Sequence, residues 1–456
     1  MGGTCLPPAL QESIPDNSNL FSVHRSATRY LLGCVGLLTL LCGVGCIGVG
    51  FWLFREPRIE IPPRRYPPDN AYDAYRELGK RIKAEFDRDA RLREVERRLF
   101  SSAEPTKAPA EDYAYYLERM RPYLEEYPKH LNRPSVAVFE YDVHWQFPEL
   151  PNLRRIARAE SLLMKEDIRR GRPFAAVQRA HRLARLAEQV RNEGVWIQYL
   201  VGMALLAFAT APLREELPSL NDANALDAIV QMVREYETRR IPAVKAMQQE
   251  YYMGLSAYRD LASGRLSYDQ IVRNQQPSPS GIATLIARPI VNTALPEYQR
   301  LMNQLIRDLK KPYWERADTE PAPKHPLNMI LVPVFARASG KEAQEIATMR
   351  LLGCAAAIKR FKQRTGRYPA TLDELQLGQI SIDPYSGKPF IYRTDPRRGF
   401  LLYSVSENRV DDGGWSPYRG VATSKGDMTP VRQLPPEPLR RKKTEELPLN
   451  QPLWLK

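Results

Sequence analysis

Cysteine and histidine are scarce in this chain, and their scarcity excludes several kinds of site. The 456 residues include five cysteines and five histidines. All the cysteines except Cys354 lie within residues 1–46, so a disulfide or a cysteine-based zinc site within the long remainder is excluded. The sequence also lacks a Walker loop, a dinucleotide-binding glycine fingerprint, an HExxH helix and a nucleophile elbow. No catalytic residue is identified, and we predict a protein that is not an enzyme.

Charge is nearly absent from residues 1–54, so the net charge of +14 belongs to the remainder of the chain. Residues 30–54 contain no charged residue at all. At ~1.5 Å per helical residue, this stretch is long enough to cross a hydrocarbon core of ~30 Å. We predict an N-terminal tail over residues 1–29 and a transmembrane helix over residues 30–54. A cleaved signal peptide would have a shorter apolar region with small residues after it, which Phe51–Arg55 does not provide.

A second uncharged stretch covers residues 194–213. It contains Gln198 and Pro212 and follows an amphipathic segment, which favours a buried core helix over a second membrane span. Arginine is more frequent after residues 30–54 than before them, which would retain the large domain in the cytoplasm, but long domains cross membranes largely regardless of this bias. We interpret the chain as a single-pass protein of the inner membrane with a periplasmic C-terminal domain, and the opposite orientation stays open.

The region after the membrane segment has a mainly helical pattern. Residues 55–70 are rich in proline and predict an extended stem that holds the domain off the bilayer. Residues 71–340 have apolar residues at helical spacing, interrupted by segments that contain glycine and proline. Within them, Ile156–Arg169 and Pro173–Val190 predict a helical hairpin of tetratricopeptide type. Repeat architectures need several copies, so a generic helical-hairpin domain is the preferred interpretation.

One segment, Phe139–Phe147, alternates apolar and polar residues and predicts a half-buried β-strand. Its polar face would align Glu140, Asp142 and His144, which are all competent metal ligands. A solvated strand face is the preferred interpretation, because one face does not supply a converging ligand set.

A different pattern begins at residue 341 and predicts a small α+β module over residues 341–427. A helix ending at Gly366 is followed by a capping box at Thr371–Glu374 and by two strands, Phe390–Arg393 and Phe400–Ser406. A polar loop comes next, over Glu407–Gly414. The remaining residues, 428–456, are rich in proline and basic residues and are predicted to be a disordered tail.

The run GRYPATLDEL…DPYSGKPFIYR…GFLLYSVSENRVDDGG, between Met349 and Trp415, resembles the C-terminal part of the major (G-type) pseudopilin of bacterial type II secretion systems. The resemblance implies a long helix packed on a small antiparallel sheet, with a calcium-binding loop after the last strands. Calcium ligands would then be Asp411 and Asp412 with Asn408, since this cation prefers oxygen ligands. A metal-free Asp-Asp-Gly-Gly turn is the alternative.

The N-terminal part departs from the pseudopilin pattern. Residues 29–40 contain no basic leader, no cleavage site and no glutamate near the start of the apolar helix. We therefore expect neither processing by a prepilin peptidase nor polymerisation as a pilus subunit. The whole layout is similar to that of large bacterial single-pass membrane proteins that carry the same C-terminal segment.

Together these features predict a mainly α-helical, membrane-anchored structural or interaction protein, associated with a type II secretion-like apparatus or the cell envelope. Its expected partners are the lipid bilayer, other proteins, and a second copy through the small residues of the membrane helix. One alternative is a cytoplasmic-facing protein whose basic surface binds nucleic acid or anionic lipid, although the helical faces mix both signs of charge. Another is an envelope hydrolase with an unrecognised site in the helical domain. No small-molecule substrate is indicated.

Overall fold

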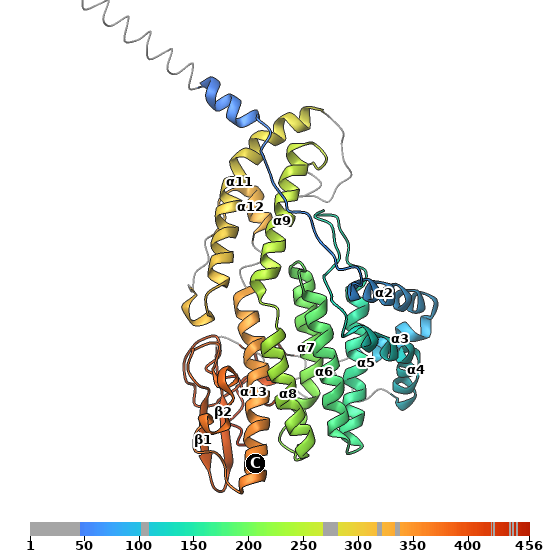
Figure 1. Ribbon diagram of the computed structural model, residues 1–456, viewed down its shortest axis with the longest axis vertical. Helices are drawn as coiled ribbons and strands as arrows, with labels where there is room; N and C mark the ends of the chain where they lie inside the picture. Colours follow the sequence, from blue (N-terminus) through green and yellow to red (C-terminus); the bar gives the residue numbers. More distant parts are fainter. Residues whose placement is uncertain are drawn as a thin grey trace, which may run out of the picture. The chain divides into compact units, whose positions relative to one another are not determined.

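The computed structural model describes most of the chain after the first 45 residues (Figure 1). The described residues are 46–101, 109–267, 281–316, 322–332, 338–420, 422, 425–436, 439, 442–443 and 446–456. The chain forms two compact units. The small unit combines Met1–Arg58 with Leu261–Thr293, and the large unit combines Ile59–Asp260 with Ala294–Lys456.

The described residues are mainly helical, as the sequence predicts, with one small sheet. The helices are α2 (Ala71–Arg88), α3 (Ala90–Ser101), α4 (Ala110–Glu126), α5 (Leu150–Arg169), α6 (Pro173–Arg191), α7 (Trp196–Glu216), α8 (Ala223–Arg239), α9 (Ala243–Ala262), α11 (Gly281–Leu309), α12 (Pro326–Leu331) and α13 (Ala338–Thr365). Short 3-10 helices are η2 (Tyr127–His130), η3 (Tyr313–Glu315), η5 (Leu372–Leu375), η6 (Gly378–Ser381) and η7 (Tyr418–Gly420). The strands are β1 (Ile391–Asp395) and β2 (Gly399–Tyr403).

Helices α5, α6, α7 and α8 lie side by side in the large unit (Figure 1). The predicted hairpin of α5 and α6 is confirmed: Gly171 has a positive φ of 70° at the turn, and Pro173 begins α6. Close packing of α6 on α7 depends on Gly202, because a Cβ atom there would lie 2.8 Å from the carbonyl oxygen of Ala187. Small residues therefore set the distance between these helices.

Helix α7 corresponds to the second apolar stretch of the sequence. Within the described residues it alone is long and apolar enough to cross a membrane, by length and composition. However, 61% of its most apolar window is buried inside the protein. Its neighbours α5 and α6 cover much of its surface, which favours the interpretation of α7 as a core helix.

The C-terminal module contains the predicted helix, short helix and antiparallel hairpin. Strands β1 and β2 pair from Ile391 opposite Tyr403 to Asp395 opposite Gly399. Helix α13 is buried on most sides, because α8 covers one face while η6 and β2 contact others. Gly353 brings α13 close to α8: a Cβ atom there would lie 3.0 Å from the side chain of Val233. One continuous apolar core therefore extends from the helical layer into the module.

The predicted strand over Phe139–Phe147 is wrong. The backbone turns at Asp142, whose N–H donates to the Glu140 carbonyl at 2.8 Å and whose side chain accepts from the His144 N–H at 2.9 Å. An aspartate that bonds to the backbone two residues later favours a turn, and this local preference overrides the alternating pattern. Glu140, Asp142 and His144 are exposed and form no metal site.

The prediction of a disordered tail over residues 428–456 is wrong for the described part of that segment. Met428 pairs with Ser404, Asn450 with Ser416, and Leu455 with Phe400. Met428 and Leu455 are 0% and 2% exposed. Proline and basic charge predicted disorder by composition, whereas a few spaced apolar residues cover the hairpin and its loop. Arg440 and Arg441, in the basic run, lie outside the described residues.

Residues 30–45 of the predicted transmembrane helix also lie outside the described residues, and residues 46–54 are helical. Over residues 56–67 the stem forms neither helix nor strand, and its later part packs within the large unit. Arg64 donates to the carbonyls of Ala137 and Glu193 at 2.6 and 3.0 Å, and its guanidinium lies 3.7 Å from the centre of the Phe139 ring. Residues 59–70 are therefore part of the folded unit and do not act as a free spacer.

Candidate functional site: a basic cleft beside a buried ion-pair network

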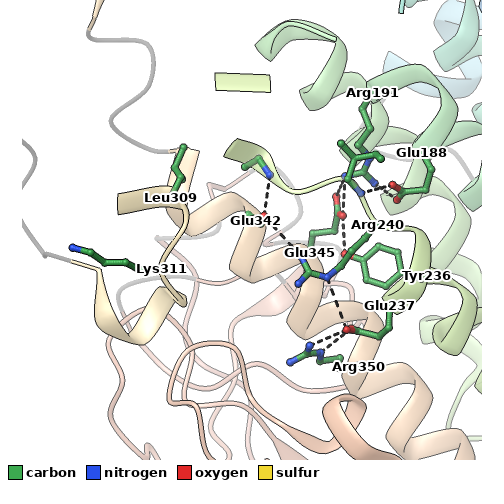
Figure 2. A network of polar contacts seen from close by, with 12 residues as sticks. Glu188, Arg191, Tyr236, Glu237, Arg240, Leu309, Lys311, Glu342, Glu345 and Arg350 are labelled. Atoms are coloured by element: carbon green, nitrogen blue, oxygen red, sulfur yellow. Dashed lines mark hydrogen bonds and ion pairs between the residues drawn. The ribbon is translucent and has the colours of Figure 1, made fainter. Parts of the chain in front are cut away.

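A buried ion-pair network joins α6, α8 and α13 in the large unit (Figure 2). Arg191 is fully buried and donates to both carboxylate oxygens of Glu345, at 2.9 and 3.1 Å, and to Glu188 at 2.8 Å. The hydroxyl of Tyr236 donates to Glu345 at 2.8 Å. Burial raises the pKa of Glu188 to about 7. Most of the polar atoms in this apolar layer are thus satisfied by one another.

A second group of ion pairs continues the network toward the surface (Figure 2). Glu342 accepts from the N–H of Ala243, at the start of α9, at 2.9 Å and from Arg316 at 3.0 Å. Arg350 donates two bonds to Glu237, at 2.8 and 2.9 Å. Arg240 lies between Glu237 and Glu342, with a shortest distance of 3.9 Å to each carboxylate.

A cleft of about 410 Å³ opens beside this second group, between the start of α9, the end of α11, η3 and α13. Cationic residues dominate its polar lining, and Glu342 is the carboxylate among them. The cationic residues are Arg240, Lys310, Lys311, Arg316 and Arg350. Tyr313 and Trp314 form an aromatic wall, and Trp314 is 38% exposed.

Arg240 is the cleft residue best placed to bind an anion. Its side chain is 30% exposed, and within the described residues it has only the two long ion pairs and no hydrogen bond. Arginine can donate two parallel hydrogen bonds to a carboxylate or a phosphate. A cleft of this size, with convergent charged groups beside an aromatic wall, is suited to a ligand that carries an anionic group. The arrangement can hold an acidic side chain next to an apolar group.

The predicted calcium ligands lie in one loop but are bonded to protein groups. The Asn408 amide donates to Asp412 at 2.8 Å, and the Tyr403 hydroxyl donates to Asp411 at 2.8 Å. Arg393 lies 3.5 Å from Asp411. In the part of the chain that the structure describes, no group of three or more His, Cys, Asp and Glu side chains is placed to hold a metal. Calcium binding therefore stays a prediction.

Sequence reasoning missed Asp427, which lies behind this loop. It is fully buried and accepts the N–H groups of Asp412 and Gly414, at 3.3 and 2.7 Å. Burial raises the pKa of its carboxyl to about 7. A lone aspartate before Met428 in a proline-rich segment carries no sequence signal of this role.

Lowering the pH from 7 to 4 is expected to stabilise the protein through Asp427. In the folded state the Asp427 carboxyl stays protonated up to about pH 7, whereas in the unfolded chain it loses its proton near the usual pKa of 3.8. The gain in unfolding free energy is therefore lost as the pH rises through 7. Relative to Asp427→Asn, the wild type should gain up to about 1.4 kcal/mol of unfolding free energy per pH unit. Urea unfolding across this range, without calcium, measures the difference, and parallel pH profiles would contradict it.

The same unfolding measurement at neutral pH tests the calcium prediction. A cation held by Asp411 and Asp412 in the folded state would raise the urea midpoint when calcium is added. Equal midpoints with calcium and with a chelator would exclude it.

Cys354 and His181 are in structural positions. The Cys354 thiol donates to the Ile380 carbonyl at 3.2 Å, and burial raises its pKa. His181 pairs with Glu235 at 2.8 Å on the surface of α6 and α8. Neither has the geometry of a nucleophile with its base. Comparison with protein-family models, curated proteins and solved structures gave no match. The functional argument therefore depends on the geometry of the site.

Proposed function

We propose that the protein is an interaction protein of the bacterial cell envelope, anchored in the inner membrane by residues 30–54, with its cleft binding an acidic segment of a partner protein. The apolar helix over residues 46–54 supports the anchor, since Ile47 and Phe51 are 74% and 75% exposed and continue the uncharged run. Arg240, beside the aromatic wall, supports the acidic partner.

A role beside a type II secretion-like apparatus, rather than as a pilus subunit, is part of this proposal. The order of α13, η5, β1 and β2 agrees with the arrangement that the pseudopilin resemblance implies. In this chain α8 covers a face of α13, and Arg350 of α13 donates to Glu237 at the end of α8. A helix covered in this way has little free surface for packing into a filament of helices, so the module is expected to present its other surfaces to a partner.

The arginine-rich hairpin of α5 and α6 favours a structural role over a nucleic-acid surface. Arg179 pairs with Glu160 and Asp167, at 3.1 and 2.8 Å, and Arg172 also pairs with Asp167. Such neutralised arginines give a mixed surface and a weak field for polyanions. This observation supports the envelope proposal over the nucleic-acid alternative.

Photo-cross-linking in living cells tests the proposal. The full chain carries p-benzoylphenylalanine in place of Trp314, and a matched control carries it in place of Trp415, which is also exposed but lies outside the cleft. We expect a protein adduct from position 314 that weakens at least about tenfold with Arg240→Gln, since a charge-assisted bond contributes about 1.5–3 kcal/mol. A position-314 adduct that nuclease removes would support the nucleic-acid alternative, and adducts that are indifferent to Arg240→Gln would contradict the cleft as the binding site.

A further inference from the structure

The apolar helix over residues 46–54 ends against α11 in the small unit. The side-chain amide of Asn292 donates to the carbonyls of Trp52, Leu53 and Arg55, at 3.1, 2.7 and 2.9 Å. Asn292 is only 6% exposed. The last carbonyls of a helix have no partner within it, so they need donors from outside. Here the amide group of one buried side chain, far away in sequence, bonds two of these carbonyls, those of Trp52 and Leu53, and the carbonyl of Arg55 just after the helix.

Arg288, one helical turn before Asn292, makes a second set of contacts in the same unit. Its guanidinium donates to the carbonyl of Phe54 at 3.4 Å and to that of Ala262 at 3.3 Å, and it lies 3.6 Å from Glu56. Residues i and i+4 lie on the same face of a helix, so both side chains reach the chain where the apolar run ends. The end of α9, the start of α11 and the end of the apolar helix are thus bonded together.

The start of α11 is itself apolar. Residues 281–291 read GIATLIARPIV, and Arg288 is the charged residue among them. Ala287 and Val291 are buried, at 8% and 0% exposure, while Ile290 is half-buried. On the partner helix, Phe51 and Phe54 are 75% and 49% exposed. The start of α11 therefore lies beside the end of the helix over residues 46–54, which carries exposed aromatic side chains. Aromatic residues at the end of an uncharged helix are typical of the boundary between lipid and water.

We propose that the start of α11, through Ile290, is a second membrane-contacting element, which lies in the interfacial layer of the bilayer beside the end of the transmembrane helix. This inference rests on the proposed membrane anchor. Asn292 and Arg288 fix the depth of α11, because their partners are the carbonyls at the end of the apolar run. Ile290, which the protein only half buries, places its remaining apolar surface among lipid acyl chains, as in interfacial helices.

Lipid quenching of single fluorescent labels tests this inference in the full chain, reconstituted in vesicles of phosphatidylethanolamine and phosphatidylglycerol. Single cysteines labelled with an environment-sensitive fluorophore are placed at Ile290, at Leu40 within the membrane segment and at Glu77 on α2, with the native cysteines replaced. We expect blue-shifted emission, and quenching by nitroxide-bearing lipids, at positions 290 and 40, and neither at position 77. Adding Asn292→Ala should weaken the quenching at position 290, whereas Thr293→Ala should not.

The label at Leu40 separates failure of the inference from failure of the anchor. Quenching at position 40 but not at position 290 overturns the membrane contact of α11 and leaves the anchor in place. Absence of quenching at both positions overturns the anchor and, with it, this inference. Equal quenching at position 77 would also overturn the inference, since the label would then report non-specific adsorption to the vesicles.

Discussion

Arg191→Met is expected to lower the unfolding free energy by about 3–5 kcal/mol, because it leaves two buried glutamates without their cation. Glu345 loses both of its bonds from Arg191, and Glu188 loses one. Methionine occupies a similar volume, so little of the loss comes from a cavity. Urea unfolding of the detergent-solubilised protein at pH 8, where Glu188 is largely ionised, measures the effect.

The matched control removes a cation from an exposed ion pair. Lys80 and Glu77 on α2 are 3.4 Å apart, with side chains 64% and 60% exposed. Lys80→Met should change the unfolding free energy by less than about 1 kcal/mol. If Arg191→Met has an equally small effect, the network does not stabilise the helical layer and the interpretation of Figure 2 as a structural network is wrong.

The second large effect is expected for Leu455→Ala, which should lower the unfolding free energy by about 2–5 kcal/mol. Leu455 is 2% exposed, and its backbone exchanges two hydrogen bonds with Phe400, both of 2.8 Å. The backbone of Leu455 also lies close to Gly399, where a Cβ atom would be 2.0 Å from the Leu455 carbonyl oxygen and where φ is +102°. Leu455 therefore adds a single β-bridge to the outer edge of β2, and truncating its side chain opens a cavity beside the hairpin.

Pro448→Ala is the control for this prediction, since Pro448 is exposed in the same segment. It should leave the urea midpoint nearly unchanged. Hydrogen exchange gives a second reading: the amide of Phe400 should exchange faster in Leu455→Ala than in Pro448→Ala. Equal exchange in both variants would show that the segment does not stabilise the hairpin.

Helices and the C-terminal hairpin were predictable because their signals are local. The α5–α6 turn follows from Gly171 and Pro173, and the β1–β2 hairpin from two apolar runs around Asp395–Gly399. The predicted strand at residues 139–147 failed because a single aspartate turn outweighed an alternating pattern. The predicted disorder failed for the described residues of 428–456, because composition averages over the few buried side chains that decide packing.

The candidate site was beyond sequence reasoning because distant segments build it. Arg240, Arg316 and Glu342 come from three separate parts of the chain, and none belongs to a recognisable motif. The loop of Asp411 and Asp412 was found from a resemblance, yet the buried carboxylate beside it, Asp427, was not. A sequence pattern reflects interactions between residues that are close along the chain. Ion pairs and clefts depend instead on which surfaces meet after folding.

The pairing of Arg191 with Glu345 has a consequence for the order of events during synthesis. The two residues are 154 positions apart, so α6 and α8 leave the ribosome well before α13 can cover them. Until then, Arg191 and the apolar face that α13 covers in the folded protein remain exposed to water. Contacts between residues so far apart in the sequence also form slowly. The nascent helical layer is therefore expected to need protection by a chaperone until α13 arrives.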